Sequence, residues 1–272
     1  MISIRNKDYI WSISEILKHP LDPLKPHLIN TLDLYINYIS IPLIIFGITG
    51  LVLFFLDKKN KESILNPKYL VLICWWLLPL IANAAMAKVF TARYILFTIP
   101  SLVVLISIGF SNFLTKIKLN ILKIILLISI FALNISFIYK ISINPFNHKL
   151  SSTEQGYLSD WTSGWGIKES ADFLKERSLS ANVIVGTEGF FGTLPDGLQI
   201  YGNKIPHLTI IGVGLGFSEL PKNLVDAKNH GDEVYLLINK SRLKLNITDL
   251  NKLQLVKSFD KPGEDKLLLY KF

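Results

Sequence analysis

The 272-residue sequence has a single cysteine and several long stretches that lack any charged residue. One cysteine, Cys74, excludes an internal disulfide bond. The sequence also lacks a Walker motif, a zinc-ligand spacing, a nucleophile elbow and an N-terminal signal peptide. Half of the residues are hydrophobic and the mean hydropathy is +0.39, which is too apolar for an ordinary soluble domain.

The net charge is +8, but the basic residues do not form a pattern typical of nucleic-acid binding. The lysines are dispersed, and neither a basic helix nor an aromatic RNA-binding motif occurs. We therefore interpret the basic balance as that of a membrane protein whose lysines lie beside lipid headgroups, with no nucleic-acid partner.

Four apolar runs predict membrane-spanning helices, because each is close to the roughly 20 residues that a bilayer requires. A buried core helix does not explain them, since four such runs in about 100 residues leave no polar face for water. The expected fold is a polytopic α-helical membrane domain, 39–140, between an amphipathic segment, 1–38, and an α/β domain, 141–272. The predicted spans are about 39–56, 69–86, 94–111 and 121–139.

The cations of the short loops predict the orientation. The loops after the first and third runs carry most of them: Lys58, Lys59, Lys61, Lys68, Lys116, Lys118 and Lys123. The loop after the second run has only Lys88 and Arg93. We expect the lysine-rich loops in the cytoplasm of a multi-pass plasma-membrane protein. The N-terminal segment, the Lys88–Arg93 loop and the α/β domain are then extracytoplasmic.

Prolines and asparagines interrupt the apolar runs. Pro79 and Pro100 are expected to kink their helices, since each removes a backbone hydrogen bond. Asn83 and Asn134 are expected to form helix–helix hydrogen bonds. Asn83 is also a candidate to face a substrate cavity, because it lies about one turn from Lys88.

The N-terminal segment, 1–38, is expected to form short amphipathic helices on the membrane surface. Ser12 and Glu15 have the spacing of a capping box. The proline-rich stretch 19–27 is not expected to be a continuous helix. His19 and His27 lack the carboxylates or cysteines that would indicate a metal site.

The C-terminal region alternates strand and helix signals, which predicts a small parallel or mixed sheet covered by helices. The expected strands are 182–186, 207–213 and 233–238, the helices are 166–178, 194–201 and 220–230, and a hairpin pairs 253–259 with 266–272. The 212–216 stretch departs from the dinucleotide fingerprint and is interpreted as a glycine-rich loop.

Two loops of this domain carry candidate substrate-facing residues. Glu188 and Asp196 follow the first strand, at the edge of the sheet where α/β proteins tend to bind ligands. Trp161 and Trp165 lie in a second loop, where their rings stack on a sugar, contact the membrane or pack into the core. For both loops a purely structural role is the competing interpretation.

The link between the second and third apolar runs is the most informative stretch. It contains Lys88, Arg93 and Tyr94, the groups needed to neutralise and hydrogen-bond a phosphate at the membrane surface. A simple anchor in the headgroup layer is the alternative. The run Arg93-Tyr94-Ile95-Leu96-Phe97-Thr98-Ile99-Pro100 resembles the R-Y-x-L-x-x-x-P stretch late in the membrane domain of GT-C glycosyltransferases. The resemblance is to the bacterial protein O-mannosyltransferase-like and aminoarabinose-transferase-like enzymes, and 186–198 resembles their soluble domain.

The resemblance implies sugar transfer from a polyprenyl-phosphate carrier at the external membrane face to a glycan, lipid or protein acceptor. It places Tyr94 on the carrier phosphate, with Arg93 and Lys88 neutralising it, and it implies no tightly bound cofactor. Stabilising the charge that grows on this phosphate would favour departure of the sugar.

The sequence departs from that family in one respect. The family's catalytic acidic residue lies in a loop after its first span, and no such loop precedes the runs found here. We therefore expect the C-terminal portion of an enzyme, inactive alone and completed by a missing N-terminal half. The alternative function is a non-catalytic membrane protein that anchors an external α/β interaction domain.

Overall fold

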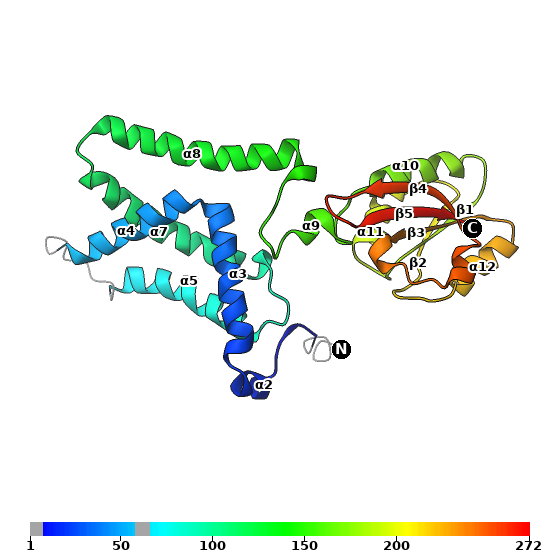
Figure 1. The fold of residues 1–272 in the computed structure, drawn as a ribbon, viewed down its shortest axis with the longest axis horizontal. Coiled ribbons are helices and arrows are strands. Elements are labelled where there is room, and N and C mark those ends of the chain that lie inside the picture. The colour runs from blue at the N-terminus through cyan, green and yellow to red at the C-terminus, as the bar shows by residue number, and fades with distance from the viewer. Residues whose placement is uncertain (1–7, 58–65) are drawn as a thin grey trace. The chain divides into compact units, whose positions relative to one another are not determined.

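A computed structural model describes residues 8–57 and 66–272 (Figure 1). The chain forms two compact units that divide between Glu154 and Gln155. Residues 141–154, which the sequence assigned to the α/β domain, lie with the helical unit. The predicted cytoplasmic lysines at 58, 59 and 61 lie outside the described residues.

The helical unit contains three helices, or up to four spans with a bent pair, that are long and apolar enough to cross a membrane. Its elements are α2 (Ile13–Lys18), α3 (Leu21–Ile39), α4 (Ile41–Leu56), α5 (Pro67–Met86), α6 (Ala92–Ile95), η1 (Leu96–Thr98), α7 (Ile99–Lys116), α8 (Asn120–Ile143) and η2 (Pro145–Asn147). The three are α5, the continuous stretch Ala92–Lys116, and α8. These correspond to the predicted runs at 69–86, 94–111 and 121–139.

The first predicted span, 39–56, does not stand alone. Helix α4 has 16 residues and passes the length requirement only together with α3, from which it is bent by 104°. The bend lies at Ser40, whose φ of 74° is outside the helical range. The chain therefore has a broken span or a re-entrant pair here, where the hydropathy indicated one helix.

The prediction that 19–27 cannot be a continuous helix is wrong from Leu21 onward. Helix α3 begins there and includes Pro23 and Pro26. Pro23 lies in the first turn, where its missing N–H would have no helical partner, so only Pro26 removes an interior hydrogen bond. The predicted capping box of Ser12 and Glu15 is confirmed at the start of α2.

Pro79 lies inside α5 as predicted, whereas Pro100 lies within the longer stretch Ala92–Lys116 but not in the interior of an α-helix. It occupies the first turn of α7, directly after the 3-10 turn η1, where proline costs little. The asparagines also differ from expectation. Asn83 and Asn134 donate to Pro79 O and Ile130 O, four residues back in their own helices, both at 2.8 Å, so these amides do not join helices.

Helices α4 and α7 pack through glycines. A Cβ atom on Gly50 would overlap the carbonyl of Gly109, and one on Gly109 would overlap the carbonyl of Gly47. Small residues allow such close approach, which favours helix association in lipid. The C-terminal ends of the two helices also meet, because Lys116 pairs with Asp57 at 3.1 Å.

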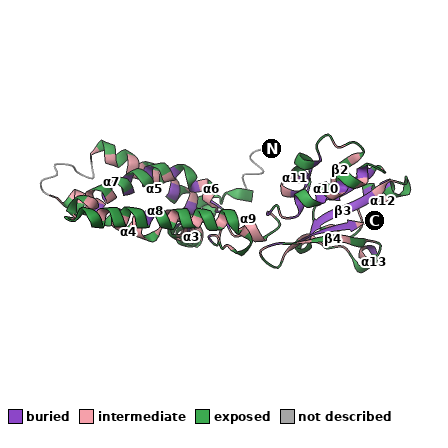
Figure 2. Cartoon of the chain, turned by 90° about the horizontal axis from the view of Figure 1, so that it is seen from above, coloured by how far each residue is buried: buried purple, intermediate pink, exposed green. Residues whose placement is uncertain are grey.

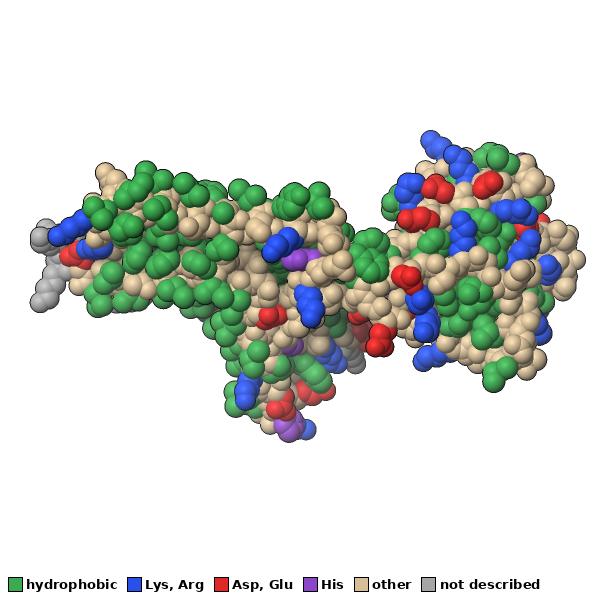
Figure 3. Space-filling model, turned by 45° about the horizontal axis from the view of Figure 1, so that its top comes forward, with side chains coloured by type: hydrophobic (Ala, Val, Ile, Leu, Met, Phe, Trp, Pro, Cys, Tyr) green, Lys and Arg blue, Asp and Glu red, His purple; other side chains and the backbone are tan. Residues whose placement is uncertain are grey.

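Much of the remaining helical surface is apolar and exposed. Figure 2 shows most of α8 as exposed, and Figure 3 shows broad hydrophobic areas along the long helices with charges near their ends. This distribution suits a hydrocarbon environment, where apolar side chains face outward.

The second unit is a mixed α/β sheet covered by helices (Figure 1), as the sequence predicted. Its helices and strands are α9 (Gly156–Ser159), α10 (Ile167–Ser178), β1 (Val183–Thr187), α11 (Thr193–Gly202), β2 (Leu208–Gly212), α12 (Lys222–Asn229), β3 (Glu233–Asn239), η3 (Lys240–Arg242), α13 (Ile247–Leu250), β4 (Gln254–Asp260) and β5 (Lys266–Lys271).

The five strands have the order β2-β1-β3-β5-β4. Strand β1 pairs in parallel with β2 and β3, with Val183 opposite Leu208 and Glu233. The β4–β5 hairpin adds antiparallel strands, so β4 runs in the same direction as β3. The ends of β1, β3 and β4 therefore lie at one edge of the sheet, which we call the carboxyl edge. Separate apolar cores cover the two faces of the sheet.

Candidate functional site

The link between α5 and α6 is held by the N-terminal segment. Ile10 and Ala87 form an antiparallel β-bridge. Trp11 N donates to Met86 O and Lys88 N donates to Tyr9 O, both at 2.8 Å. Two chain segments that are far apart in sequence thus fix the backbone that carries the predicted phosphate-binding residues.

Further contacts hold the same link from other sides. The Ala92 N–H donates to the buried carboxylate of Glu154 at 2.8 Å. His27 Nδ1 lies 2.8 Å from Ala84 O, and its ring stacks on Phe90 with centroids 4.6 Å apart. Phe90 belongs to a buried core with Leu34, Leu80, Ala84, Ala87 and Ile95. The link is therefore packed into the helical unit and held there by hydrogen bonds.

A cavity of about 740 Å³ opens beside this link. Arg93, Tyr94 and Asn83 line it, together with Tyr9, Ile10, Ala82, Met86, Ala87 and Val89. The guanidinium of Arg93 donates to the Tyr94 hydroxyl at 3.3 Å and lies 5.1 Å from that ring's centroid. The structure thus brings together three of the residues that the sequence singled out.

Lys88 is placed differently. Its ammonium lies 4.8 Å from the centroid of the Trp11 ring, and the residue is not among those that line the cavity. The described lining residues include no aspartate or glutamate. The cavity can therefore offer cationic and hydroxyl donors to an anion within apolar walls, but it offers no carboxylate as a general base.

In the α/β unit, Glu188 lies at the centre of a buried polar cluster. It directly follows β1, and only 3 % of it is exposed. Its carboxylate accepts from Asn239 Nδ2 at 2.7 Å and from Asn239 N at 3.0 Å. Burial raises the pKa of Glu188, and the Asn239 hydrogen bonds with the charges of Arg242 and Lys261 oppose that rise.

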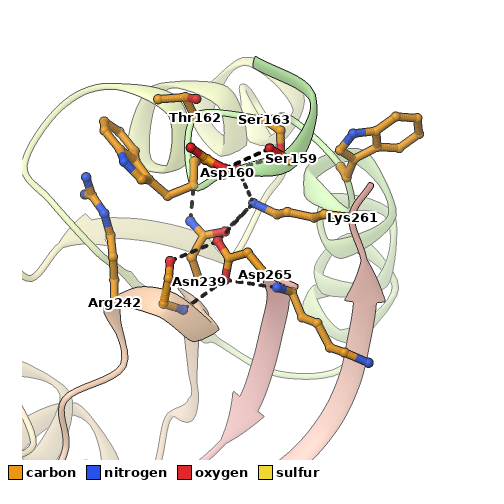
Figure 4. Close-up of polar contacts among 12 residues, drawn as sticks. Ser159, Asp160, Thr162, Ser163, Asn239, Arg242, Lys261 and Asp265 are labelled. Atoms are coloured by element: carbon orange, nitrogen blue, oxygen red, sulfur yellow. Dashed lines mark hydrogen bonds and ion pairs between the residues drawn. The ribbon is translucent and has the colours of Figure 1, made fainter. Parts of the chain in front are cut away.

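Lys261 completes this cluster from the end of β4 (Figure 4). Its buried ammonium donates to Asn239 Oδ1 at 2.5 Å and to Asp160 O at 3.0 Å. The Asp265 carboxylate lies 3.9 Å away. Burial lowers the pKa of Lys261 against the opposing effect of nearby carboxylates. The cluster joins the chain segments at the carboxyl edge to one another.

The other predicted residues of this unit have structural contacts. The guanidinium carbon of Arg242 lies 3.5 Å from the centroid of the Trp161 ring. The Arg242 side chain also lies 3.7 Å from the Glu188 carboxylate. Trp165 Nε1 donates to Leu158 O at 2.9 Å. Asp196 is exposed, and its carboxylate accepts from Gly192 N at 2.9 Å at the start of α11. One face of Trp161 is therefore occupied by arginine.

Sequence reasoning missed Asn239, Arg242 and Lys261. A usable signal was present, because Asn239 ends β3 and Lys261 directly follows β4, and strand ends of the same direction meet at one edge. It also missed Glu154 and Asp33. Asp33 accepts from Ser151 Oγ at 2.8 Å and from Ser152 N at 3.0 Å, and so ties 151–154 to α3.

Within residues 8–57 and 66–272, no group of three or more histidine, cysteine, aspartate or glutamate residues could hold a metal ion. Comparison of the sequence and structure with protein-family models, curated proteins and solved structures finds no match.

Proposed function

We propose that this chain is a membrane protein that binds the phosphate of a polyprenyl-phosphate-linked sugar at the Lys88–Tyr94 link. In this proposal it is the C-terminal part of a glycosyltransferase. The observation that carries the proposal is the cavity beside the link, which joins Arg93 and Tyr94 to apolar walls.

The chemistry of the cavity suits a lipid phosphate. An arginine can donate two parallel hydrogen bonds to phosphate oxygens, and a tyrosine hydroxyl can donate a third. Arg93 is exposed and already oriented against Tyr94, so less freedom is lost when an anion binds. Apolar lining residues such as Met86 and Val89 would contact the first carbons of the carrier chain.

The two ends of the helical unit support the proposed orientation. The ends of α4 and α7 meet at the Asp57–Lys116 pair, so both lysine-rich loops leave one end of the unit. Residues 151–154 instead lie beside the Ala92 end of the link, through Glu154. We propose that the first end is cytoplasmic, and that the link and the α/β unit are extracytoplasmic at the plasma membrane.

The lining residues limit the proposal to donor binding. A transferase must also activate its acceptor, and the cavity has no carboxylate for this step among its described lining residues. Glu188 and Asp196 are engaged in the contacts of their own unit. This structural use favours the second candidate, a non-catalytic protein that anchors an external α/β interaction domain.

Binding of a polyprenyl phosphate to the purified protein in detergent tests the proposal. The double variant Arg93→Ala, Tyr94→Phe should bind at least about a hundredfold more weakly, because charge-assisted hydrogen bonds contribute about 1.5–3 kcal/mol each and the variant removes more than one of them. Lys140→Ala is the matched control, since it removes an exposed cation from the last turn of α8.

Two results would decide against phosphate binding at the link. One is equal affinity of the wild type and the double variant. The other is an equal loss in the control, which would show a general attraction between a basic protein and an anionic lipid. Both results would favour the anchoring function.

A further inference from the structure

Two consecutive phenylalanines at the carboxyl edge of the α/β sheet are exposed. Phe190 is 75 % exposed and Phe191 is 72 % exposed, in the loop between β1 and α11. Leu215, on the loop after β2, is 59 % exposed. We call these three residues the apolar tip. Single exposed apolar residues are ordinary, but a contiguous group of large ones marks an interaction site.

The backbone holds the tip in place. Gly189 and Gly192, on either side of the phenylalanines, have φ values of 76° and 103°, in a range that favours glycine. Gly189 N donates to Gly214 O at 2.7 Å, and Gly192 N donates to Asp196. The two loops of the tip are thus bridged to each other, and the exposure of Phe190 is a property of the fold.

A cationic segment lies on one side of the tip. The segment after β3 runs beside it, since Asn239 binds Glu188 and the Lys244 side chain lies next to Gly216. We call Lys240, Arg242 and Lys244 the basic collar. Lys240 and Lys244 are exposed, and neither ammonium has an ion pair within the described part of the chain. Trp161, against which Arg242 stacks, is 39 % exposed.

We propose that the apolar tip inserts into the surface of the lipid bilayer while the basic collar binds anionic headgroups. Apolar and aromatic side chains at the headgroup boundary, with lysine and arginine around them, are the pattern of interfacial membrane binding. The helices that can span a membrane are joined to this unit through residues 144–154, so a bilayer is always within reach of the chain. The proposal does not depend on sugar transfer.

A fluorescent label on the tip tests this insertion. The full chain with Cys74→Ala and Phe191→Cys is labelled with an environment-sensitive fluorophore and placed in nanodiscs containing anionic lipid. We expect a blue shift of the emission, and stronger quenching by a nitroxide on the acyl chain than by one on the headgroup. The control is Leu179→Cys, which is 83 % exposed at the opposite edge of the sheet and should report water.

A second variant tests the role of the collar. Lys240→Glu with Lys244→Glu should reduce acyl-chain quenching in anionic nanodiscs and leave it unchanged in zwitterionic ones. Emission typical of water at position 191 would overturn the proposal. A blue shift without quenching by lipid nitroxides would also overturn it, because the tip would then be covered by protein. If the collar variant reduced quenching equally in anionic and zwitterionic nanodiscs, the proposed contact between the basic collar and anionic headgroups would be wrong.

Discussion

Glu233 gathers three donors on one carboxylate oxygen at the first position of β3. Lys271 Nζ donates at 2.5 Å, Tyr235 OH at 2.7 Å and the Arg177 guanidinium at 2.8 Å. Burial raises the pKa of Glu233, but these hydrogen bonds outweigh it and lower the pKa to about 2. Burial and the charge of Glu233 raise the pKa of Tyr235 to about 12.

The lowered pKa predicts how the α/β unit responds to acid. A carboxyl group whose pKa is lower in the folded state than in the unfolded state stabilises the folded state at any pH above its unfolded-state pKa. This stabilisation is lost as the pH falls from the unfolded-state pKa to the folded-state pKa. The window therefore runs from about pH 4.5 down to about 2, with a loss on the order of 3 kcal/mol. This loss of stability can be measured by urea unfolding of the full chain at each pH, with hydrogen-exchange protection of β3 as the readout.

Glu233→Gln should lower stability at neutral pH and flatten this acid dependence. Glu176→Gln is the control, since Glu176 is exposed on α10. A wild-type stability that does not change between pH 4.5 and 2 would contradict the assigned role of Glu233.

At the same scale, local contacts were predictable and distant ones were not. Ser12 and Glu15 are three residues apart, so their capping box can be inferred from spacing alone. The position of Glu188 directly after a predicted strand made it a candidate substrate-facing residue. Its partners Asn239 and Lys261 are 51 and 73 residues away, and only the pairing of β1 with β3 and of β4 with β5 brings them together.

At the scale of elements, helix packing in this chain depends on glycine. Gly109 of α7 faces the backbone of α4, and a Cβ there would lie 2.7 Å from Leu51 N as well as overlapping the Gly47 carbonyl. Because both atoms belong to the backbone, no side-chain rotation can relieve the clash. The amide of Asn112 also donates to Gly50 O at 2.9 Å and would be displaced.

Gly109→Ala should therefore destabilise the helical unit by about 1–3 kcal/mol, the usual cost of overpacking. The reactivity of Cys74 during heating measures this, because it is the only thiol and lies in α5. The control is Gly164→Ala, where an added Cβ meets no heavy atom within 4 Å. An unchanged Cys74 melting curve for Gly109→Ala would show that α4 and α7 do not pack as closely as described.

At the scale of the whole molecule, the proposed topology predicts opposite labelling of two sites. In a Cys74→Ala background, Glu264→Cys should react with a membrane-impermeant thiol reagent in intact cells. Lys118→Cys should react only after lysis, because it lies between α7 and α8 at the proposed cytoplasmic end. The reverse pattern would invert the orientation, and the link would then face the cytoplasm.

Hydropathy and the alternation of strand and helix signals predicted most of the secondary structure of this molecule. Uncharged runs predicted α5, α7 and α8, and the alternation of strand and helix signals predicted all five strands of the sheet. These features follow from sequence because burial of apolar side chains imposes a period on neighbouring residues. The 104° bend at Ser40 did not follow, since hydropathy reports the composition of a run and not the direction of its backbone.

For the candidate site, the sequence by itself predicted the phosphate-binding residues Lys88, Arg93 and Tyr94, shortly before or at the start of an apolar run. Only the tertiary structure decided that Arg93 and Tyr94 share a cavity with Asn83, while Lys88 lies over Trp11. The physical reason is that the Tyr9–Trp11 segment and the Glu154 carboxylate bind the link's backbone from distant parts of the chain. Such long-range hydrogen bonds leave no local pattern in the sequence.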